Sequence, residues 1–524
     1  MKTKINIYRF CHYRSLTTTA THLPKQTIKK LNQSVTRIGF GGYRINQPTS
    51  HADTLKYALQ QGINIIDTGA NFENGLSEAI IGDVLLTTTI PRSDITLVTK
   101  AGYLSKVDID RYSNNKNNNI TEENDYIHIQ GNSYHGISPK ILEDQLEQSL
   151  SRLKTNYIDV FMINAPERML SKGKTTHSQL YHELKTSFAF LKTMVQQGVI
   201  KGYGLCSNTM TSSHEAMDHF SLSHFISQLQ QQHDNNNNTL MNDFVAIQTP
   251  FNLYEQHTLQ DNQFMDLIEQ HDLFLMTNRP LNAITPQGQI RGLYNHQVVQ
   301  TDMEDLSKAF EKVAQLEIDM ITELPEEVEE LEQEYEEENN RVNPFASSFV
   351  WGQVLSENLQ RLGQHHFATR HYLETQVKPT LEKDLNRFKN HYQHIPAYME
   401  WVEVYHQAMN HLLNCLVNYS YMDTLKKNND MEKILSVLVP WPHTHQSYPI
   451  TKDEIEEKDP SITYCHSPLT VKALEIYLAN QEIGSIMTGM RHPRYVDDAI
   501  IAMKEYQQSP LSQIQLMDIS RVLV

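Results

Sequence analysis

The sequence predicts an α/β fold: a (β/α)8 TIM barrel with a large α-helical insertion between the seventh strand and the helix before the eighth strand. Three observations support this prediction. Short apolar runs alternate with helical stretches from Thr36 onward, which is typical of parallel strands joined by helices. Eight such runs can be counted, the number that closes a barrel. Roughly 200 residues separate the last two runs, and about 180 of them form a segment too long and too apolar for one loop.

Each expected strand is a short apolar run followed by polar or glycine-containing residues, as buried parallel strands are. The strands are expected at residues 37–40, 63–67, 95–100, 158–164, 200–207, 244–248, 273–278 and 483–488. Helices are expected between them, from residue 58 onward and over residues 76–86, 182–197 and 257–270. A further helix is marked by leucines at 142, 146, 150 and 153, which share one helical face.

Two segments interrupt the barrel pattern. Residues 103–136 contain an asparagine run and predict a long loop after the third strand. The insertion covers residues 286–466, where aromatic and leucine positions recur at helical spacing in 349–361, 371–388 and 399–422. The predicted organisation is therefore a basic leader at 1–35, a first part of the barrel at 36–285, the insertion, and a last part of the barrel at 467–524.

The net charge of the chain is concentrated in the insertion. The formal net charge is −17, and residues 301–338 hold sixteen acidic side chains against two lysines. This stretch carries −14, so the other residues together carry only −3. It predicts one or two exposed acidic helices broken at Pro325, through which a protein partner could bind. The nearly neutral remainder excludes a broad basic face for a nucleic-acid backbone.

Composition also bears on the compartment. The four cysteines are far apart in the sequence and predict neither a disulfide framework nor a cysteine zinc site, so a reducing compartment is expected. No run of about 18 apolar residues occurs, which argues against a membrane-spanning helix. The first 30 residues are basic, rich in Thr and Ser, and precede the first acidic residue, Asp53. They predict a mitochondrial transit peptide; the alternative is a basic tail on a cytoplasmic protein.

Short motifs accompany the expected strands in a fixed order. They are RIGFGGYR at 37–44, GINIIDT at 62–68, GLSE at 75–78, VTK at 98–100, YIDV at 157–160, GLCSN at 204–208, RPL at 279–281 and TGMR at 488–491. In this order and spacing the chain resembles the aldo-keto reductases over residues 36–285 and 467–510. The resemblance implies a (β/α) barrel that binds NADP(H) at the carboxyl-terminal mouth of its strands. It also implies reduction of a small-molecule carbonyl, or oxidation of an alcohol, by direct hydride transfer without a metal ion.

The resemblance implies a catalytic tetrad of Asp, Tyr, Lys and His, in which Tyr donates a proton, Lys lowers its pKa, Asp holds Lys and His orients the substrate. Asp67 and Lys100 match this pattern. Phe72 stands where the family has Tyr, and Asn164 stands where it has His. Asn at the His position also occurs in the potassium-channel β subunits, which resemble this family. The phenyl ring of Phe72 has no proton to give.

Three functional hypotheses follow from the altered tetrad. In the first, another group donates the proton to the carbonyl: Tyr103, Tyr43, or Tyr134 and His135. In the second, the barrel binds the cofactor but turns over slowly or not at all, as a redox sensor or scaffold whose helical insertion binds a partner. In the third, the chain is a structural protein without cofactor.

The resemblance also implies cofactor-binding positions. Ser207, Asn208 and Gln248 stand where the family binds the nicotinamide carboxamide, although Ser-Asn after a strand can also cap a helix. Asn278 stands where the family often stacks an aromatic ring on the nicotinamide. Arg279 could pair with the pyrophosphate through its fork of donors.

Two arginines favour NADP over NAD. Arg491 and Arg494 follow the eighth strand, where the family holds the adenosine 2′-phosphate. Asp498 falls in the adenine-contact region, with an exposed first turn of a helix as the alternative. The expected cofactor set is completed by Gly42, Tyr43, Asp67 and Leu281 in the matched motifs. Since the insertion leaves the barrel after a strand's carboxyl end, we expect it to lie over or beside the mouth, where it restricts the substrate pocket or docks a partner.

Overall fold

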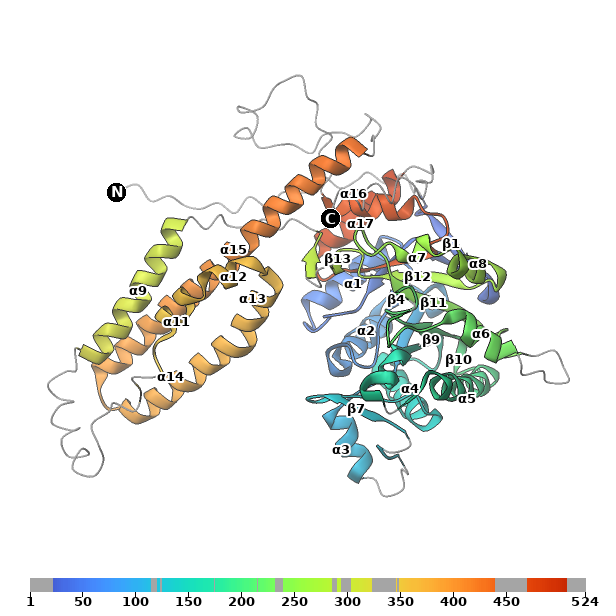
Figure 1. The fold of residues 1–524 in the computed structure, drawn as a ribbon, viewed down its shortest axis with the longest axis horizontal. Coiled ribbons are helices and arrows are strands. Elements are labelled where there is room, and N and C mark those ends of the chain that lie inside the picture. The colour runs from blue at the N-terminus through green and yellow to red at the C-terminus, as the bar shows by residue number, and fades with distance from the viewer. Residues whose placement is uncertain are drawn as a thin grey trace.

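Eight parallel strands close into a barrel in the computed structural model (Figure 1). The structure describes residues 22–114, 120–122, 125–173, 175–213, 215–230, 239–284, 290–293, 303–322, 345, 348–438 and 469–506. The barrel strands are β3 (Ile38–Gly41), β4 (Ile65–Asp67), β5 (Thr96–Ala101), β9 (Ile158–Asn164), β10 (Ile200–Cys206), β11 (Phe244–Pro250), β12 (Phe274–Asn278) and β15 (Ser485–Gly489). Each pairs with the next in chain order, and β15 closes the ring on β3. The predicted barrel is confirmed.

Helices surround this barrel largely where the sequence predicts them. They are α1 (Ser50–Gln60), α2 (Leu76–Thr87), α4 (Pro139–Leu153), α5 (His177–Gln196), α6 (Leu222–Gln230), α7 (His257–Gln260), α8 (Asn262–Gln270), α16 (Leu469–Leu478) and α17 (Pro493–Glu505). The helix expected over 257–270 is divided at Asp261, whose side chain accepts a hydrogen bond from the Phe264 amide and begins α8. Helix α5 begins earlier than predicted because Thr176 and Gln179 form a capping box.

An amino-terminal hairpin corrects the expected leader. Strands β1 (Lys25–Ile28) and β2 (Gln33–Thr36) pair antiparallel, and Ile28 and Val35 are buried with residues of the barrel strands. Between the strands, the Lys30 ammonium donates to the carbonyl oxygens of Met241 and Phe244, at 2.8 Å each. Residues 22–35 therefore belong to the fold, and the leader predicted over residues 1–35 is wrong in its boundary. Residues 1–21 lie outside the described residues.

A small sheet replaces the long loop predicted over residues 103–136. Strands β6 (Tyr103–Ser105), β7 (Ile127–Gln130) and β8 (Ser133–His135) form an antiparallel sheet in the order β6-β8-β7, joined to helix α3 (Lys106–Asn114). This sheet and α3 share a buried apolar cluster with the start of α4 (Leu104, Ile109, Tyr112, Tyr126 and Ile141). The loop prediction is wrong because strands of three or four residues leave too short a pattern to read. The run 115–119 lies outside the described residues.

The insertion follows a hairpin of β13 (Asn282–Ile284) and β14 (Ile290–Gly292). Its described helices are α9 (Met303–Thr322), α11 (Trp351–Glu357), α12 (Leu359–Gln364), α13 (His366–Tyr372), the π-helical turn η5 (Leu373–Val377), α14 (Lys378–Tyr392) and α15 (Pro396–Leu438). They gather beside the barrel around a separate apolar core (Figure 1). The predicted helical insertion is confirmed, while Pro325 and residues 323–338 of the acidic stretch lie outside the described residues.

Helix α15 joins the insertion to the barrel. Met431 and Leu435 in its last turns are buried in the barrel's apolar cluster. The Asn428 side chain donates to the Gly292 carbonyl at 2.9 Å, and Lys472 of α16 lies 3.2 Å from Glu432. The insertion thus leaves the barrel where β12 ends and returns where α16 begins. Both points are at the carboxyl end of the strands, since helices run back antiparallel in such barrels. No described helix combines the length and apolar character that crossing a membrane requires.

Glu317 is expected to stabilise the insertion from within its core. Its buried carboxylate accepts hydrogen bonds from the Gly352 amide at 2.9 Å and the Tyr405 hydroxyl at 2.8 Å. Glu317→Ala should lower the free energy of unfolding by about 1–3 kcal/mol, because both donors lose their partner. All three tryptophans of the chain, at 351, 401 and 441, lie in the insertion, so urea unfolding followed by tryptophan fluorescence reports on it selectively. Glu311→Ala on the exposed face of α9 is the control, expected to change stability by about 0.5 kcal/mol or less. Equal stability of the two variants would contradict this role of Glu317.

Candidate active site

Polar side chains converge where the barrel strands end. They come from six different strands: Asp67 on β4, Lys100 on β5, Asn164 on β9, Cys206 on β10, Gln248 on β11 and Asn278 on β12. Because the carboxyl ends of parallel strands meet at one face of a barrel, this face is the mouth at which such folds carry their chemistry. The structure therefore brings the sequence-predicted residues of these strands together.

A buried ion pair forms the floor of the mouth. The Lys100 ammonium binds Asp67 Oδ1 and donates to the Thr68 carbonyl at 3.0 Å, with the Lys100 side chain 1% exposed and that of Asp67 6% exposed. Gln248 Nε2 donates to the same carboxylate oxygen at 3.1 Å. A buried pair with additional hydrogen bonds holds one arrangement, since breaking it would leave an uncompensated charge.

Phe72 lies against this ion pair. The Lys100 ammonium nitrogen is 5.1 Å from the centroid of the Phe72 ring, within cation–π range. The Tyr43 ring meets Phe72 edge-on with centroids 5.3 Å apart, and Tyr43 is 58% exposed. The backbone turns sharply after Phe72, since Glu73 and Asn74 both adopt positive φ, of 50° and 54°. Phe72 thus occupies the position beside the lysine that the resemblance gives to a tyrosine.

Asn164 and His135 form the next part of the rim. Asn164 Nδ2 is 3.5 Å from Asn71 Oδ1, and the Asn164 backbone carbonyl oxygen is 2.8 Å from His135 Nε2. Burial lowers the pKa of His135 to about 4, so the ring is neutral near neutral pH and Nε2–H donates to that carbonyl. His135 is fully buried and its Nε2 is engaged. Tyr134 points elsewhere, with its ring against Tyr126 and His128.

Glu167 and Arg168, which follow Asn164 in the chain, also belong to the site. The sequence did not indicate a role for them. Arg168 Nε donates to the Tyr103 hydroxyl at 3.1 Å. Glu167 is 3% exposed and accepts from the Asn208 amide at 3.2 Å. Burial raises the pKa of Glu167 to about 6, against the opposing effect of its hydrogen bonds. The only signal in the sequence is two charged residues just after a strand end, which is common on protein surfaces.

An amide cluster lies at the ends of β10, β11 and β12. Ser207 is buried and its amide donates to the Gln248 carbonyl at 3.0 Å, whereas Asn208 is exposed. Gln248 Oε1 lies 3.3 Å from Cys206 Sγ and 3.5 Å from Asn278 Nδ2. The buried Asn278 Oδ1 has no hydrogen-bond partner among the described residues. An unpaired amide oxygen at a strand end is suited to accept a hydrogen bond from a ligand.

Of the arginines expected to bind the cofactor's phosphates, one is already paired with a carboxylate. The Arg279 guanidinium is paired with Glu255 at 2.8 Å, although its buried Nε has no partner among the described residues. Arg491 and Arg494 are half-buried around the start of α17. A side chain at Gly489, just before them, would meet no atom within 4 Å, so the backbone there faces open space. Two arginines therefore follow an open stretch of backbone at the end of β15.

The remaining predicted cofactor positions, Gly42, Leu281 and Asp498, differ in burial and packing. A Cβ atom on Gly42 would lie 2.9 Å from Ser77 Oγ and 3.0 Å from the Asp67 carbonyl, so packing alone requires glycine there. Leu281 is half-buried and packs against the barrel core. Asp498 is 6% exposed, and burial raises its pKa to about 6. The predicted alternative for Asp498, an exposed first turn, is therefore wrong.

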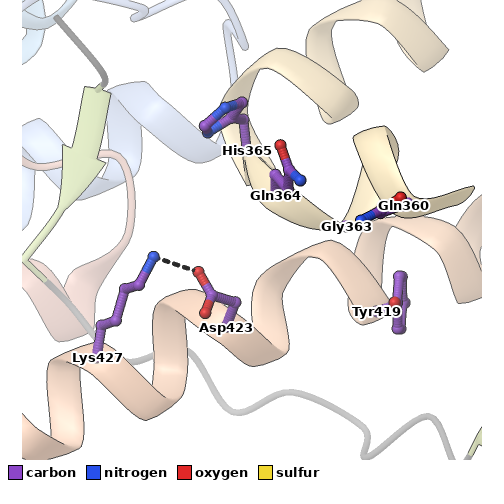
Figure 2. Close-up of a pocket in the computed structure, with 7 residues that line it drawn as sticks. All are labelled: Gln360, Gly363, Gln364, His365, Tyr419, Asp423 and Lys427. Carbon is purple, nitrogen blue, oxygen red and sulfur yellow. Dashed lines mark ion pairs between the residues drawn. The ribbon is translucent and has the colours of Figure 1, made fainter. Parts of the chain in front are cut away.

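A separate pocket of about 490 Å³ lies in the insertion, between α12 and α15 (Figure 2). Its lining is largely polar: Gln360, Gly363, Gln364, His365, Tyr419, Asp423 and Lys427. Asp423 and Lys427 pair with each other at 2.6 Å within α15. None of the residues predicted for catalysis or cofactor binding lines this pocket. Within the described parts of the chain, no group of His, Cys, Asp and Glu is arranged to hold a metal ion.

Comparison with known proteins identifies the family. The profile of the Aldo/keto reductase family matches residues 37–350. The chain belongs to this family. It is therefore an oxidoreductase that acts on a small molecule, and the resemblance predicted from the motifs is confirmed.

Three known proteins show how similar this aldo-keto reductase is to others. It is 22% identical to the uncharacterized oxidoreductase YqkF of Bacillus subtilis over 301 residues, 55% of this chain and 78% of that one. It is 30% identical to the aldo-keto reductase dtxS3 of Metarhizium robertsii over 212 residues, which span 40% of this chain and 49% of that one. A solved structure, the holo form of AKR11C1 from Bacillus halodurans, is 19% identical, covers 56% of this chain and 77% of that one, and has a TM-score of 0.36.

Proposed function

We propose that this aldo-keto reductase reduces a carbonyl, or oxidises the corresponding alcohol, by direct hydride transfer with NADP(H). The observation that carries the proposal is the buried Lys100–Asp67 pair, which Gln248 fixes at the mouth of the barrel. A lysine held in this way presents a positive charge where a carbonyl oxygen gains negative charge during reduction.

The mouth has features that fit a dinucleotide. The unpaired Asn278 oxygen, Ser207 and Asn208 would hold a carboxamide, and Arg491 and Arg494 beside the open Gly489 backbone would hold a phosphate. When bound, the nicotinamide supplies the hydride. The protein supplies binding, orientation and electrostatics: Lys100 stabilises the developing alkoxide, Asp67 keeps Lys100 in place, and the Asn164 amide donates to the carbonyl oxygen.

The test is NADPH oxidation by the full chain against a panel of aldehydes, ketones and quinones. Cofactor binding is followed separately, through quenching of NADPH fluorescence. Turnover of at least one carbonyl is expected. Binding without turnover of any of them would leave the cofactor-binding scaffold as the better account, and absence of NADPH binding would favour a structural protein.

Arg494→Ala is expected to weaken NADPH binding about 10-fold, because a charge-assisted hydrogen bond to the 2′-phosphate contributes about 1.5–3 kcal/mol. The dissociation constant for NADH should stay within about twofold, because NADH lacks this phosphate. Fluorescence titration with both cofactors measures the two effects. Lys504→Ala, at the exposed far end of α17, is the control and should leave both constants unchanged. Equal losses for NADH and NADPH would contradict a 2′-phosphate site.

The location of the protein and the role of the insertion stay predictions. We propose that the basic residues before residue 22 address the chain to the mitochondrion, which sequencing of the mature amino terminus would test. We also propose that the insertion, attached at the mouth by α15, binds a partner or limits the substrate. Replacing the ten glutamates between residues 323 and 338 by glutamine should weaken binding of a basic partner protein, measured by co-purification, because these side chains carry most of the charge of residues 301–338.

A further inference from the structure

The reaction proposed above needs a proton for the carbonyl oxygen, and Phe72 cannot give one. The sequence offers four candidate donors: Tyr43, Tyr103, Tyr134 and His135. His135 donates to the Asn164 carbonyl and is fully buried. The Tyr134 ring packs against Tyr126 and His128, within the small sheet. These contacts leave the hydroxyls of Tyr43 and Tyr103.

The Tyr103 side chain is held by contacts of both its ring and its hydroxyl. It follows Lys100 by three residues, at the point where the chain leaves β5. Its ring packs edge-on against the buried His135 ring, with centroids 5.1 Å apart. Its hydroxyl oxygen accepts the hydrogen bond from Arg168 Nε at 3.1 Å. Tyr43, by contrast, is 58% exposed.

The direction of the Arg168–Tyr103 hydrogen bond leaves the phenolic hydrogen available. A guanidinium has donors and no acceptor, so Arg168 can only give a hydrogen bond to the Tyr103 oxygen. The hydroxyl hydrogen of Tyr103 therefore remains free to bind another acceptor. The same guanidinium would stabilise the negative charge left on the oxygen once that hydrogen has gone.

The contacts of Tyr103 lie beside the end of β9. Its ring packs on His135, whose Nε2 donates to the Asn164 backbone carbonyl, and its hydroxyl binds Arg168, four residues beyond Asn164. Strand β9 pairs with β5, which carries Lys100. The Tyr103 side chain is thus held at the rim of the mouth, on the side formed by β5 and β9. Burial raises the pKa of Tyr103, so the phenol is protonated near neutral pH.

We propose that Tyr103 is the proton donor of this reductase and that Arg168 is its positioning residue. This inference rests on the proposed function. As hydride reaches the carbonyl carbon, the carbonyl π bond breaks and its electron pair goes to oxygen. That oxygen takes the proton from Tyr103, forming the alcohol O–H bond as the phenolic O–H bond breaks. The phenolate, stabilised by Arg168, then takes a proton from water, which restores the phenol.

Tyr103→Phe tests this assignment, because it removes only the hydroxyl. With NADPH and a carbonyl turned over by the wild type, kcat should fall about 10²–10⁴-fold, while the dissociation constant for NADPH stays within about twofold. Tyr134→Phe is the matched control in the same small sheet, since it loses the same atom away from the mouth, and its kcat should equal that of the wild type. Arg168→Gln should lower kcat by about 10-fold, and Arg168→Lys should recover part of that loss because a donor returns.

A second variant distinguishes chemistry from structure. Adding Phe72→Tyr to Tyr103→Phe places a phenol beside Lys100, at the position the family uses, and should raise kcat at least tenfold above that of Tyr103→Phe alone. If Tyr103 had only a structural role, a new phenol at position 72 would not restore kcat. If Tyr103→Phe keeps the activity of Tyr134→Phe, the assignment is overturned while the proposed function stands. If the wild type turns over no carbonyl, the proposed function and the assignment both fail.

Discussion

Replacing Lys100 by methionine is expected to remove activity and to destabilise the barrel. Without the ammonium, no cation stabilises the charge that develops on the carbonyl oxygen, and loss of such a group typically lowers kcat by about 10²–10³-fold. The substitution also leaves the Asp67 carboxylate buried, with Gln248 Nε2 as its one remaining donor among the residues that the structure describes. Breaking a buried ion pair in this way should lower the free energy of unfolding by about 3–5 kcal/mol.

Urea unfolding followed by far-ultraviolet circular dichroism measures the stability loss, and steady-state kinetics measures kcat. Lys154→Met is the control, because Lys154 pairs with Asp83 at the surface, where the two side chains are 40% and 62% exposed. Its stability should change by no more than about 1 kcal/mol, and its kcat should not change. Changing Asp67 to leucine in the Lys100→Met background should regain part of the stability, but no activity. A Lys100→Met protein as stable as the control would contradict the burial argument.

Asp159→Asn is expected to be the most destabilising change outside the mouth. Asp159 is fully buried near the start of β9, where its carboxylate binds Arg92 at 2.8 Å and Lys201 at 2.7 Å. It also accepts from the Leu97 amide at 2.9 Å. A neutral amide cannot pair with both cations and accept from the backbone amide, so the free energy of unfolding should fall by about 3–5 kcal/mol.

The activity of Asp159→Asn should separate stability from catalysis. Because Asp159 lies at the opposite end of the barrel strands from the mouth, kcat per folded molecule should match that of the wild type at a temperature where the variant is folded. Asp94→Asn, at an exposed carboxylate nearby, is the control and should change stability by about 0.5 kcal/mol or less. A loss of kcat in a fully folded Asp159→Asn protein would show that this network reaches the active site.

The barrel could be predicted from the sequence because its strands are buried on both faces. Such strands leave uninterrupted apolar runs, as in β9, where every residue is buried. The ends of these runs then predict which side chains share the mouth: Asp67 and Lys100 pair there, and Asn164 ends β9, the strand next to β5. The hairpin of β1 and β2 was predicted as a leader because its lysines are basic residues in the sequence, whereas Lys30 is held by two carbonyl oxygens of the fold.

The parts of the site that could not be predicted depend on contacts between distant segments. Arg168 reaches Tyr103 across 65 residues of sequence. Arg279 was expected to bind a pyrophosphate, but it pairs with Glu255, a partner that no spacing rule indicates. Periodicity and motif spacing describe one segment at a time, so side chains that meet only after the barrel closes remain invisible to them.

A single turnover of bound NADPH with an aldehyde from the panel, followed by rapid-mixing absorbance, measures hydride transfer directly. We expect the wild type to oxidise NADPH and form the alcohol, with a slower step when the transferred hydrogen is deuterium. We expect Lys100→Met to bind NADPH but to oxidise it at least about 100-fold more slowly. NADPH that stays reduced on the wild-type protein with every carbonyl, or a Lys100→Met protein as fast as the wild type, would contradict hydride transfer assisted by Lys100.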